Sequence, residues 1–217
     1  MDALAAARLI ALVGMTAGLV GVLTRIRQIM NRPFKQDLSR PQGSVRRGVL
    51  YAFTLGMAPW EKESTRIHWL AYFRGIFFHL GVFGAFAVLF ASPWLEGFSK
   101  PLTWASLALT GGGAIFGFAG IFIRLKGANE RRLSLPDDYF SVFLTSLFVA
   151  LAFIVLLLPA WLPVFYIAAG ILCAYVPFSK IRHCVYFFYS KFFFGKNFGQ
   201  RGVIGQAEGK YADRGTP

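Results

Sequence analysis

The chain has 217 residues, of which 56% are hydrophobic and only 15% carry a charge, whereas a soluble domain has about 25% charged residues. Apolar runs of about 20 residues, the length that crosses a bilayer, recur along the chain. This composition excludes an ordinary soluble domain and predicts an all-α membrane protein that is a bundle of transmembrane helices.

Five apolar segments predict five membrane spans. The first begins with MDALAAAR, which differs from the basic start of a signal peptide, and its apolar stretch is long, so we expect an uncleaved helix. The expected spans cover residues 4–23, 69–90, 102–123, 139–158 and 162–189. We expect residues 1–190 to form one membrane domain, followed by a basic, Gly-rich tail over residues 191–217.

The loop between the first two spans, residues 25–66, is strongly basic. Its first half holds seven cations and the single acid Asp37; the cations are Arg25, Arg27, Arg32, Lys35, Arg40, Arg46 and Arg47. Within the loop, the stretch from Gly48 to Trp60 is apolar but too short to span a bilayer. We expect this stretch to lie in the membrane interface, with Trp60 as an anchor.

The distribution of cations predicts the topology. The loops after spans one and three and the C-terminal tail are rich in Lys and Arg, whereas the loop after span two has one Lys and the loop after span four has none. By the positive-inside rule the N-terminus lies outside and the C-terminus in the cytoplasm. Topology accounts for the net charge of +13, so no nucleic-acid partner is expected. The basic face could also bind anionic lipid or an acidic partner subunit.

The two cysteines do not indicate a redox centre. Cys173 and Cys184 lie 11 residues apart in one expected helix, about 16 Å, which is too far for a disulfide bond. The chain has no CxxC pattern, so we expect no iron–sulfur cluster in it. No nucleotide-binding or hydrolase pattern occurs either, and no catalytic residue is expected.

Histidines are the chemical signal in the apolar segments. His79 lies in the second expected span and His183 near the end of the fifth, and an ionisable group inside a span is costly and marks function. Each could make an interhelical hydrogen bond, or the two could be axial ligands of one haem. His68 lies at the membrane surface, about 16 Å along the helix from His79, so these two cannot share an iron. Because His79 and His183 both fall in the cytoplasmic half, they are the favoured pair.

Three cations lie close to these histidines. Arg74 precedes His79 by five residues, and Lys180 and Arg182 precede His183. They could neutralise the propionates of a b-type haem, since Arg pairs well with carboxylate. They could equally be residues that reach the membrane surface and follow the topology.

Two segments around the histidines carry a family resemblance. FFHLGVFGAF, which contains His79, and VPFSKIRH, which ends at His183, resemble the haem-ligand helices of the gamma subunit of respiratory nitrate reductase, a five-span cytochrome b. Relatives in heterodisulfide-reductase-like and high-molecular-weight cytochrome complexes are similar too, including the ending FFFGKNFGQRGV. The family usually has four histidines and two haems. Here Leu89 and Phe165 stand where the second pair of ligands would be, so the resemblance implies one haem b.

The resemblance also implies a role. The chain would be the membrane subunit of a quinone-linked respiratory oxidoreductase in the prokaryotic cytoplasmic membrane, without catalytic activity of its own. It would carry electrons between quinone and an iron–sulfur or heterodisulfide-reductase-like subunit on the cytoplasmic side. Lys100 on the outer side and His68 on the inner side are candidates for the vicinity of the quinone. The alternative is a membrane anchor subunit without haem.

Overall fold

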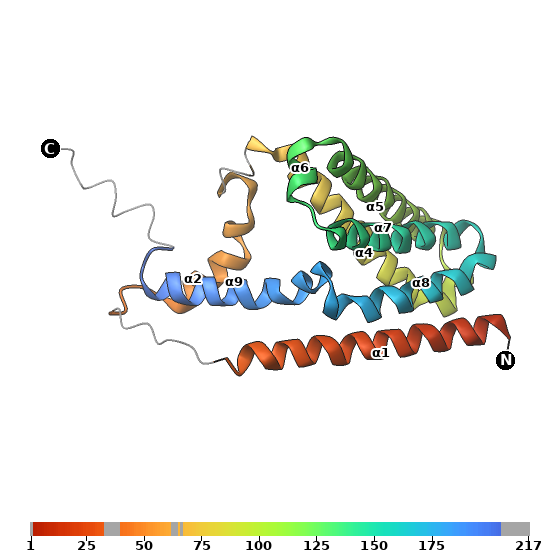
Figure 1. Cartoon of the computed structure of the whole chain (residues 1–217), viewed down its shortest axis with the longest axis horizontal. Helices are drawn as coiled ribbons and strands as arrows, with labels where there is room; N and C mark the ends of the chain where they lie inside the picture. The colour runs from red at the N-terminus through yellow and green to blue at the C-terminus, as the bar shows by residue number, and fades with distance from the viewer. Residues whose placement is uncertain (1, 33–39, 62–64, 66, 205–217) are drawn as a thin grey trace. The chain divides into compact units, whose positions relative to one another are not determined.

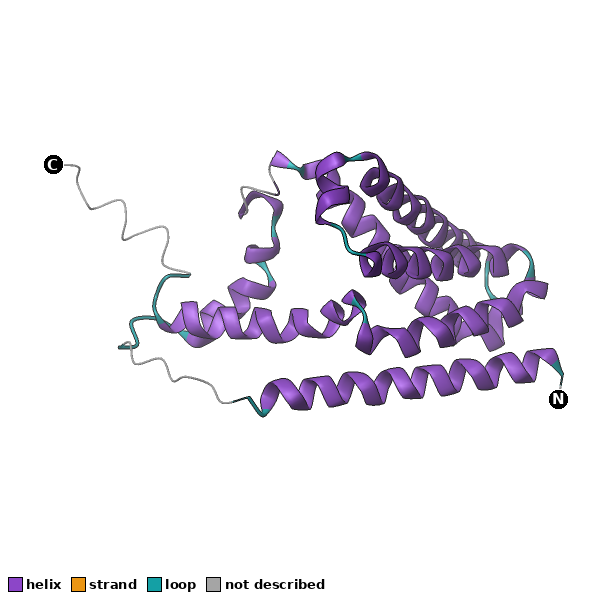
Figure 2. Ribbon diagram, in the orientation of Figure 1, coloured by secondary structure: helices purple, strands orange, loops and turns teal. Residues whose placement is uncertain are grey.

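The computed structural model describes residues 2–32, 40–61, 65 and 67–204, and within these residues every regular element is helical (Figures 1 and 2). The α-helices are α1 (Ala3–Met30), α2 (Val45–Phe53), α4 (Trp69–Ala91), α5 (Lys100–Lys126), α6 (Ala128–Leu133), α7 (Pro136–Leu157), α8 (Leu162–Tyr175) and α9 (His183–Gln200). Short 3-10 turns join several of them. The chain forms two compact units, one of Met1–Arg27 with Leu70–Arg182 and one of Gln28–Trp69 with His183–Pro217.

The all-α class with five potential spans is confirmed. Within the described residues, five helical segments are long and apolar enough to cross a membrane: Ala3–Met30, Trp69–Gly97, Lys100–Lys126, Pro136–Leu157 and Pro159–Phe178. Each contains most of one expected span. The outside position of the N-terminus and the cytoplasmic position of the C-terminus stay predictions.

The range 162–189, expected as one helix, is divided in the structure. Helix α8 ends at Tyr175, two 3-10 turns follow over Val176–Phe178 and Lys180–Arg182, and α9 begins at His183. Pro177 accounts for the break, because proline has no N–H to donate and its ring crowds the preceding turn. His183 therefore starts a new helix instead of lying near the end of the fifth span. The expected tail begins inside α9, and its part beyond residue 204 lies outside the described residues.

The core of the first unit is centred on α7. Phe148 of α7 is fully buried and stacks on Phe165 of α8, with ring centroids 5.2 Å apart, and Phe86 of α4 packs against it at 4.9 Å. Helices α4 and α5 approach closely because glycines face each other: a Cβ atom on Gly113 would lie 2.5 Å from the Cα of Gly81.

Helix α1 belongs to the same unit and runs alongside α8 (Figure 1). Its buried residues are all small and recur at intervals of four and three, which places them on one helix face; they are Ala7, Ala11, Gly14 and Gly18. A Cβ atom on Gly170 of α8 would lie 2.7 Å from the carbonyl oxygen of Ile10. Small residues therefore let the two backbones touch, as is common between helices in membranes.

In the second unit α2 packs directly on α9. A Cβ atom on Gly199 would lie 2.7 Å from the Cα of Gly48, and one on Gly195 would lie 2.6 Å from the Cα of Val49. Ser44 caps α2 by accepting the Arg47 N–H at 3.4 Å. The stretch from Gly48 to Trp60 thus forms most of α2 and two 3-10 turns, and its place in the membrane interface stays a prediction. Of the cations in the preceding loop, Lys35 lies outside the described residues, as does Asp37.

Candidate functional site

His79 projects from an exposed position on α4, and its ring is oriented by the helix backbone. Its Nδ1 atom lies 2.6 Å from the carbonyl oxygen of Gly75, one turn earlier. A carbonyl oxygen only accepts, so this contact assigns the proton to Nδ1 and the lone pair of the neutral ring to Nε2. A metal-ligating histidine commonly has this arrangement, in which one ring nitrogen donates to a carbonyl and the other faces the metal.

The helix surface around His79 is open on the side of Gly75. A Cβ atom built on Gly75 would have no atom within 4 Å outside its own turn, so the space beside it is open. The Phe78 ring lies edge-on to the imidazole, with centroids 5.9 Å apart. Arg74 is half-buried on the same helix.

His183 is the exposed first residue of α9 and follows the 3-10 turn that contains Lys180 and Arg182. It lies in the second unit, whereas His79 lies in the first, so the pairing of the two histidines stays a prediction. His68 is exposed directly before α4, and Lys100 is the exposed first residue of α5. The parts played by His68 and Lys100 near a quinone likewise stay predictions.

The two positions at which the family resemblance would place further ligands are filled with core side chains. Leu89 is 5% exposed and Phe165 is fully buried, and both belong to one hydrophobic cluster in the first unit. Phe165 stacks on Phe148 there. The interior that these two positions share is thus occupied by packed side chains of α4, α7 and α8.

A polar network at the start of α7 was not foreseen. Asp137 accepts hydrogen bonds from the Tyr175 hydroxyl, from the Ser141 hydroxyl at 3.1 Å and from the Lys180 backbone N–H at 2.9 Å. The Lys180 ammonium lies 2.6 Å from the Asp138 carboxylate. The sequence signal was PDD after a basic loop, since proline and acidic residues favour the first turn of a helix.

A protein-only metal site is not supported within the described residues, because these contain no group of three or more His, Cys, Asp or Glu side chains that could hold an ion. Haem iron has a smaller requirement, since the porphyrin supplies four ligands and the protein only the axial ones. The residues His79 and His183 fit that requirement by chemical type.

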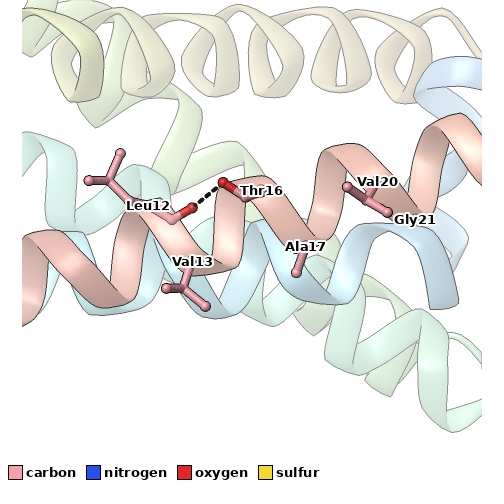
Figure 3. A pocket seen from close by; sticks show the side chains of 6 residues that line it. All are labelled: Leu12, Val13, Thr16, Ala17, Val20 and Gly21. Atoms are coloured by element: carbon pink, nitrogen blue, oxygen red, sulfur yellow. Dashed lines mark hydrogen bonds between the residues drawn. The ribbon is translucent and has the colours of Figure 1, made fainter.

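Figure 3 shows a shallow hollow on the side of α1, lined by Leu12, Val13, Thr16, Ala17, Val20 and Gly21. Its lining is almost entirely apolar, and the Thr16 hydroxyl donates to the Leu12 carbonyl at 2.8 Å. A single helix provides every lining residue, and none of the expected site residues is among them. The hollow is therefore not part of the candidate site.

No protein-family model, no curated protein and no solved structure matches the chain.

Proposed function

We propose that the chain is a cytochrome b subunit that holds one bis-histidine haem b and carries electrons between membrane quinone and an iron–sulfur subunit on the cytoplasmic side. The observation that supports this most directly is the contact between Nδ1 of His79 and the Gly75 carbonyl. It gives Nδ1 the proton and Nε2 the lone pair, which is the tautomer of a histidine that ligates a metal through Nε2.

The cations near the two histidines support a haem in the cytoplasmic half of the membrane. Arg74 precedes His79 by five residues, about 7.5 Å along α4, and His183 follows Phe178, the end of the last candidate span, by five residues. Cations mark the cytoplasmic side under the positive-inside rule. His79 lies ten residues, about 15 Å, inside the candidate span that begins at Trp69, whereas His183 lies five residues beyond the last candidate span, and the expected cytoplasmic boundary is the nearer reference for both only under that topology.

Each residue has a distinct part in the proposed site. When bound, haem supplies one-electron transfer. His79 and His183 hold its iron, and Arg74 and Arg182 neutralise its propionates. Lys180 was an equal candidate for the propionates on sequence alone. Its ammonium lies 2.6 Å from the Asp138 carboxylate, so Lys180 is a weaker candidate than the sequence alone suggests.

The packed interior around Leu89 and Phe165 supports quinone exchange from the cytoplasmic half. With side chains in place of a second haem, an electron from the outer surface would cross much of the hydrocarbon without a relay. We therefore assign the quinone vicinity to the side of His68 and not to that of Lys100. Protons would be exchanged on the same side, and turnover through this subunit would move no net charge across the membrane.

The purified protein is expected to contain about one haem b per chain, with the reduced spectrum of a six-coordinate low-spin iron. The reason is that two suitable histidines remain, while Leu89 and Phe165 occupy the other ligand positions. Haem extraction with quantification against protein, together with a visible spectrum, checks this. Two haems per chain would contradict the single-site proposal, and none would favour the alternative of a haem-free anchor subunit.

Topology can be tested separately with reporter fusions. A periplasm-active phosphatase joined before Ala3 is expected to be active and one joined after Val203 inactive, with the opposite result for a fluorescent protein that folds only in the cytoplasm. The reason is the Lys and Arg bias of the loops. The reverse pattern would place His79 and His183 on the outer side and contradict the proposed docking of a cytoplasmic partner.

A further inference from the structure

The α5–α7 connection, residues 127–135, is too short to leave the surface of a membrane. Both helices are candidate spans, α5 ending at Lys126 and α7 starting at Pro136, so the connection leaves and re-enters the membrane on one side. Gly127 alone separates α5 from α6, and two residues separate α6 from α7 (Figure 1). Helix α6 itself has six residues and is only about 9 Å long. Any membrane that holds α5 and α7 therefore keeps α6 at its surface.

Hydrogen bonds hold this connection in one shape. Arg124, near the end of α5, donates to the Ser134 hydroxyl at 3.1 Å, and that hydroxyl donates to the Glu130 carbonyl at 2.7 Å. Glu130 is the one acid among residues 127–135. A Cβ atom built on Gly127 would meet the Glu130 carboxylate, so this carboxylate is folded against the start of α6. It forms no ion pair with a cation in the part of the chain that the structure describes.

Three exposed cations in and beside this connection keep their charge without an acidic partner. The side chains of Lys126 and Arg132 make no ion pair or hydrogen bond with any residue that the structure describes. Arg131 donates to the Leu125 carbonyl at 3.4 Å, a neutral acceptor that does not cancel its charge. With Glu130 as the only acid, residues 126–135 have three cations and one acid, a net charge of +2. This charge is available to an anion outside the chain.

Large apolar side chains lie next to these cations. Leu133 is 83% exposed, Leu135 is 60% exposed and Leu125, on the last turn of α5, is 49% exposed. Single exposed leucines are common on soluble proteins and need no explanation. Here they lie on a segment that a membrane keeps at its surface, beside exposed cations. Cations together with exposed apolar side chains are the composition of segments that lie in the membrane interface.

We propose that the α5–α7 connection is a binding site for anionic phospholipid. Lys126, Arg131 and Arg132 contact the headgroup phosphates, and Leu133 and Leu135 insert among the upper parts of the acyl chains. Both features are needed to choose this occupant, because a neutral lipid would satisfy the leucines but not the cations, and an anionic surface attracts each cation. Lipid headgroups are also within contact distance of α6 whenever α5 and α7 span the bilayer, whereas an acidic protein would have to reach the same surface.

Hydrogen exchange of the purified full-length protein in nanodiscs tests the proposal at α6 itself. One set of nanodiscs contains phosphatidylcholine, which is neutral overall, and the other an equal mixture of it with the anionic lipid phosphatidylglycerol. Amides of residues 128–133 are expected to exchange at least about fivefold more slowly in the anionic nanodiscs, because each cation at an anionic surface strengthens binding by about that factor. Equal exchange in the two nanodiscs would overturn the proposal and leave the cations to an acidic protein partner.

Two double variants show whether the difference arises at this connection. Arg131→Gln/Arg132→Gln is expected to remove most of the difference between the nanodiscs, because two of the three cations are lost. The matched control Arg46→Gln/Arg47→Gln removes an exposed, adjacent arginine pair from α2 and is expected to keep the difference at residues 128–133. A difference that persists in Arg131→Gln/Arg132→Gln would contradict the proposed contacts.

Two further measurements separate charge from insertion. High salt is expected to abolish the dependence on lipid charge, because it screens exposed charges. Leu133→Gln keeps the cations and is expected to speed exchange of α6 in both nanodiscs, since an inserted apolar side chain is lost. Unchanged exchange in Leu133→Gln, or equal protection by inorganic phosphate in detergent, would contradict a lipid surface as the ligand. These readouts do not need haem, so they are independent of the proposed function.

Discussion

Replacing either His79 or His183 by alanine is expected to abolish the six-coordinate low-spin haem spectrum, while His68→Ala leaves it in place. Loss of one axial nitrogen leaves the iron five-coordinate, or leaves the haem unbound, in a site built for two imidazoles. The contact of Nδ1 with the Gly75 carbonyl orients the His79 ring, and α4 contains no other histidine that could ligate the iron in its place. Visible and EPR spectra of the three variants, each scaled to protein, measure the effect.

Imidazole rescue separates loss of a ligand from loss of fold. With His79→Gly in place of alanine, added imidazole is expected to restore a low-spin spectrum, because the free base can occupy the position of the missing side chain. His68→Ala is the matched control, since His68 lies close in sequence but in an exposed position before α4. Loss of haem in His68→Ala with retention in His79→Ala would show that the pairing of histidines is wrong.

The limits of the middle spans could be predicted from hydropathy to within a few residues. Helix α4 covers Trp69–Ala91 where 69–90 was expected, and α7 covers Pro136–Leu157 where 139–158 was expected. Helix α1 instead continues to Met30, past the expected end at residue 23. Hydropathy locates the edge of the hydrocarbon, whereas Arg25 and Arg27 are good helix formers and let the helix continue beyond it.

The break before His183 was missed because hydropathy does not register backbone geometry. Pro177 sits in an apolar stretch that scores as one long span, and its effect depends on the missing N–H and not on polarity. The contacts that stabilise the break join residues 42 and 43 positions apart in sequence. A single sequence carries no direct signal for such pairings. For the same reason α2, expected as an interfacial segment, and α9, expected as the end of the fifth span and the start of the tail, were not expected to pack on each other.

The candidate ligands were found by residue type, and their local geometry came only from the structure. A histidine in an apolar run is visible in any sequence, and so is the replacement of two expected ligands by Leu89 and Phe165. The proton assignment of His79 is not, because it depends on where the ring lies relative to the Gly75 carbonyl. The packing of Leu89 and Phe165 into one cluster is likewise a property of the folded chain.

The close approach of α4 and α5 predicts a large difference between two adjacent glycines. Gly113→Leu is expected to destabilise the protein by about 3 kcal/mol or more, because even its Cβ would lie 2.5 Å from the Cα of Gly81, and backbone cannot move aside as a side chain can. Gly112→Leu is expected to change stability by less than about 1 kcal/mol, since a Cβ there meets nothing within 4 Å. Thermal unfolding of both variants in one detergent measures the difference.

The two variants change adjacent glycines of α5 to the same residue and add the same apolar volume. A difference between them therefore reports the contact between α4 and α5. The Gly113 variant is also expected to lose haem, because Gly81 lies two residues after His79 on α4 and forced separation of the helices would displace that turn. Haem content of Gly112→Leu is expected to match the wild type. Equal stability of the two leucine variants would mean that α4 and α5 do not touch at Gly81 and Gly113. Loss of haem in both leucine variants would place the haem against the open side of α5, near Gly112, and not against the exposed side of α4.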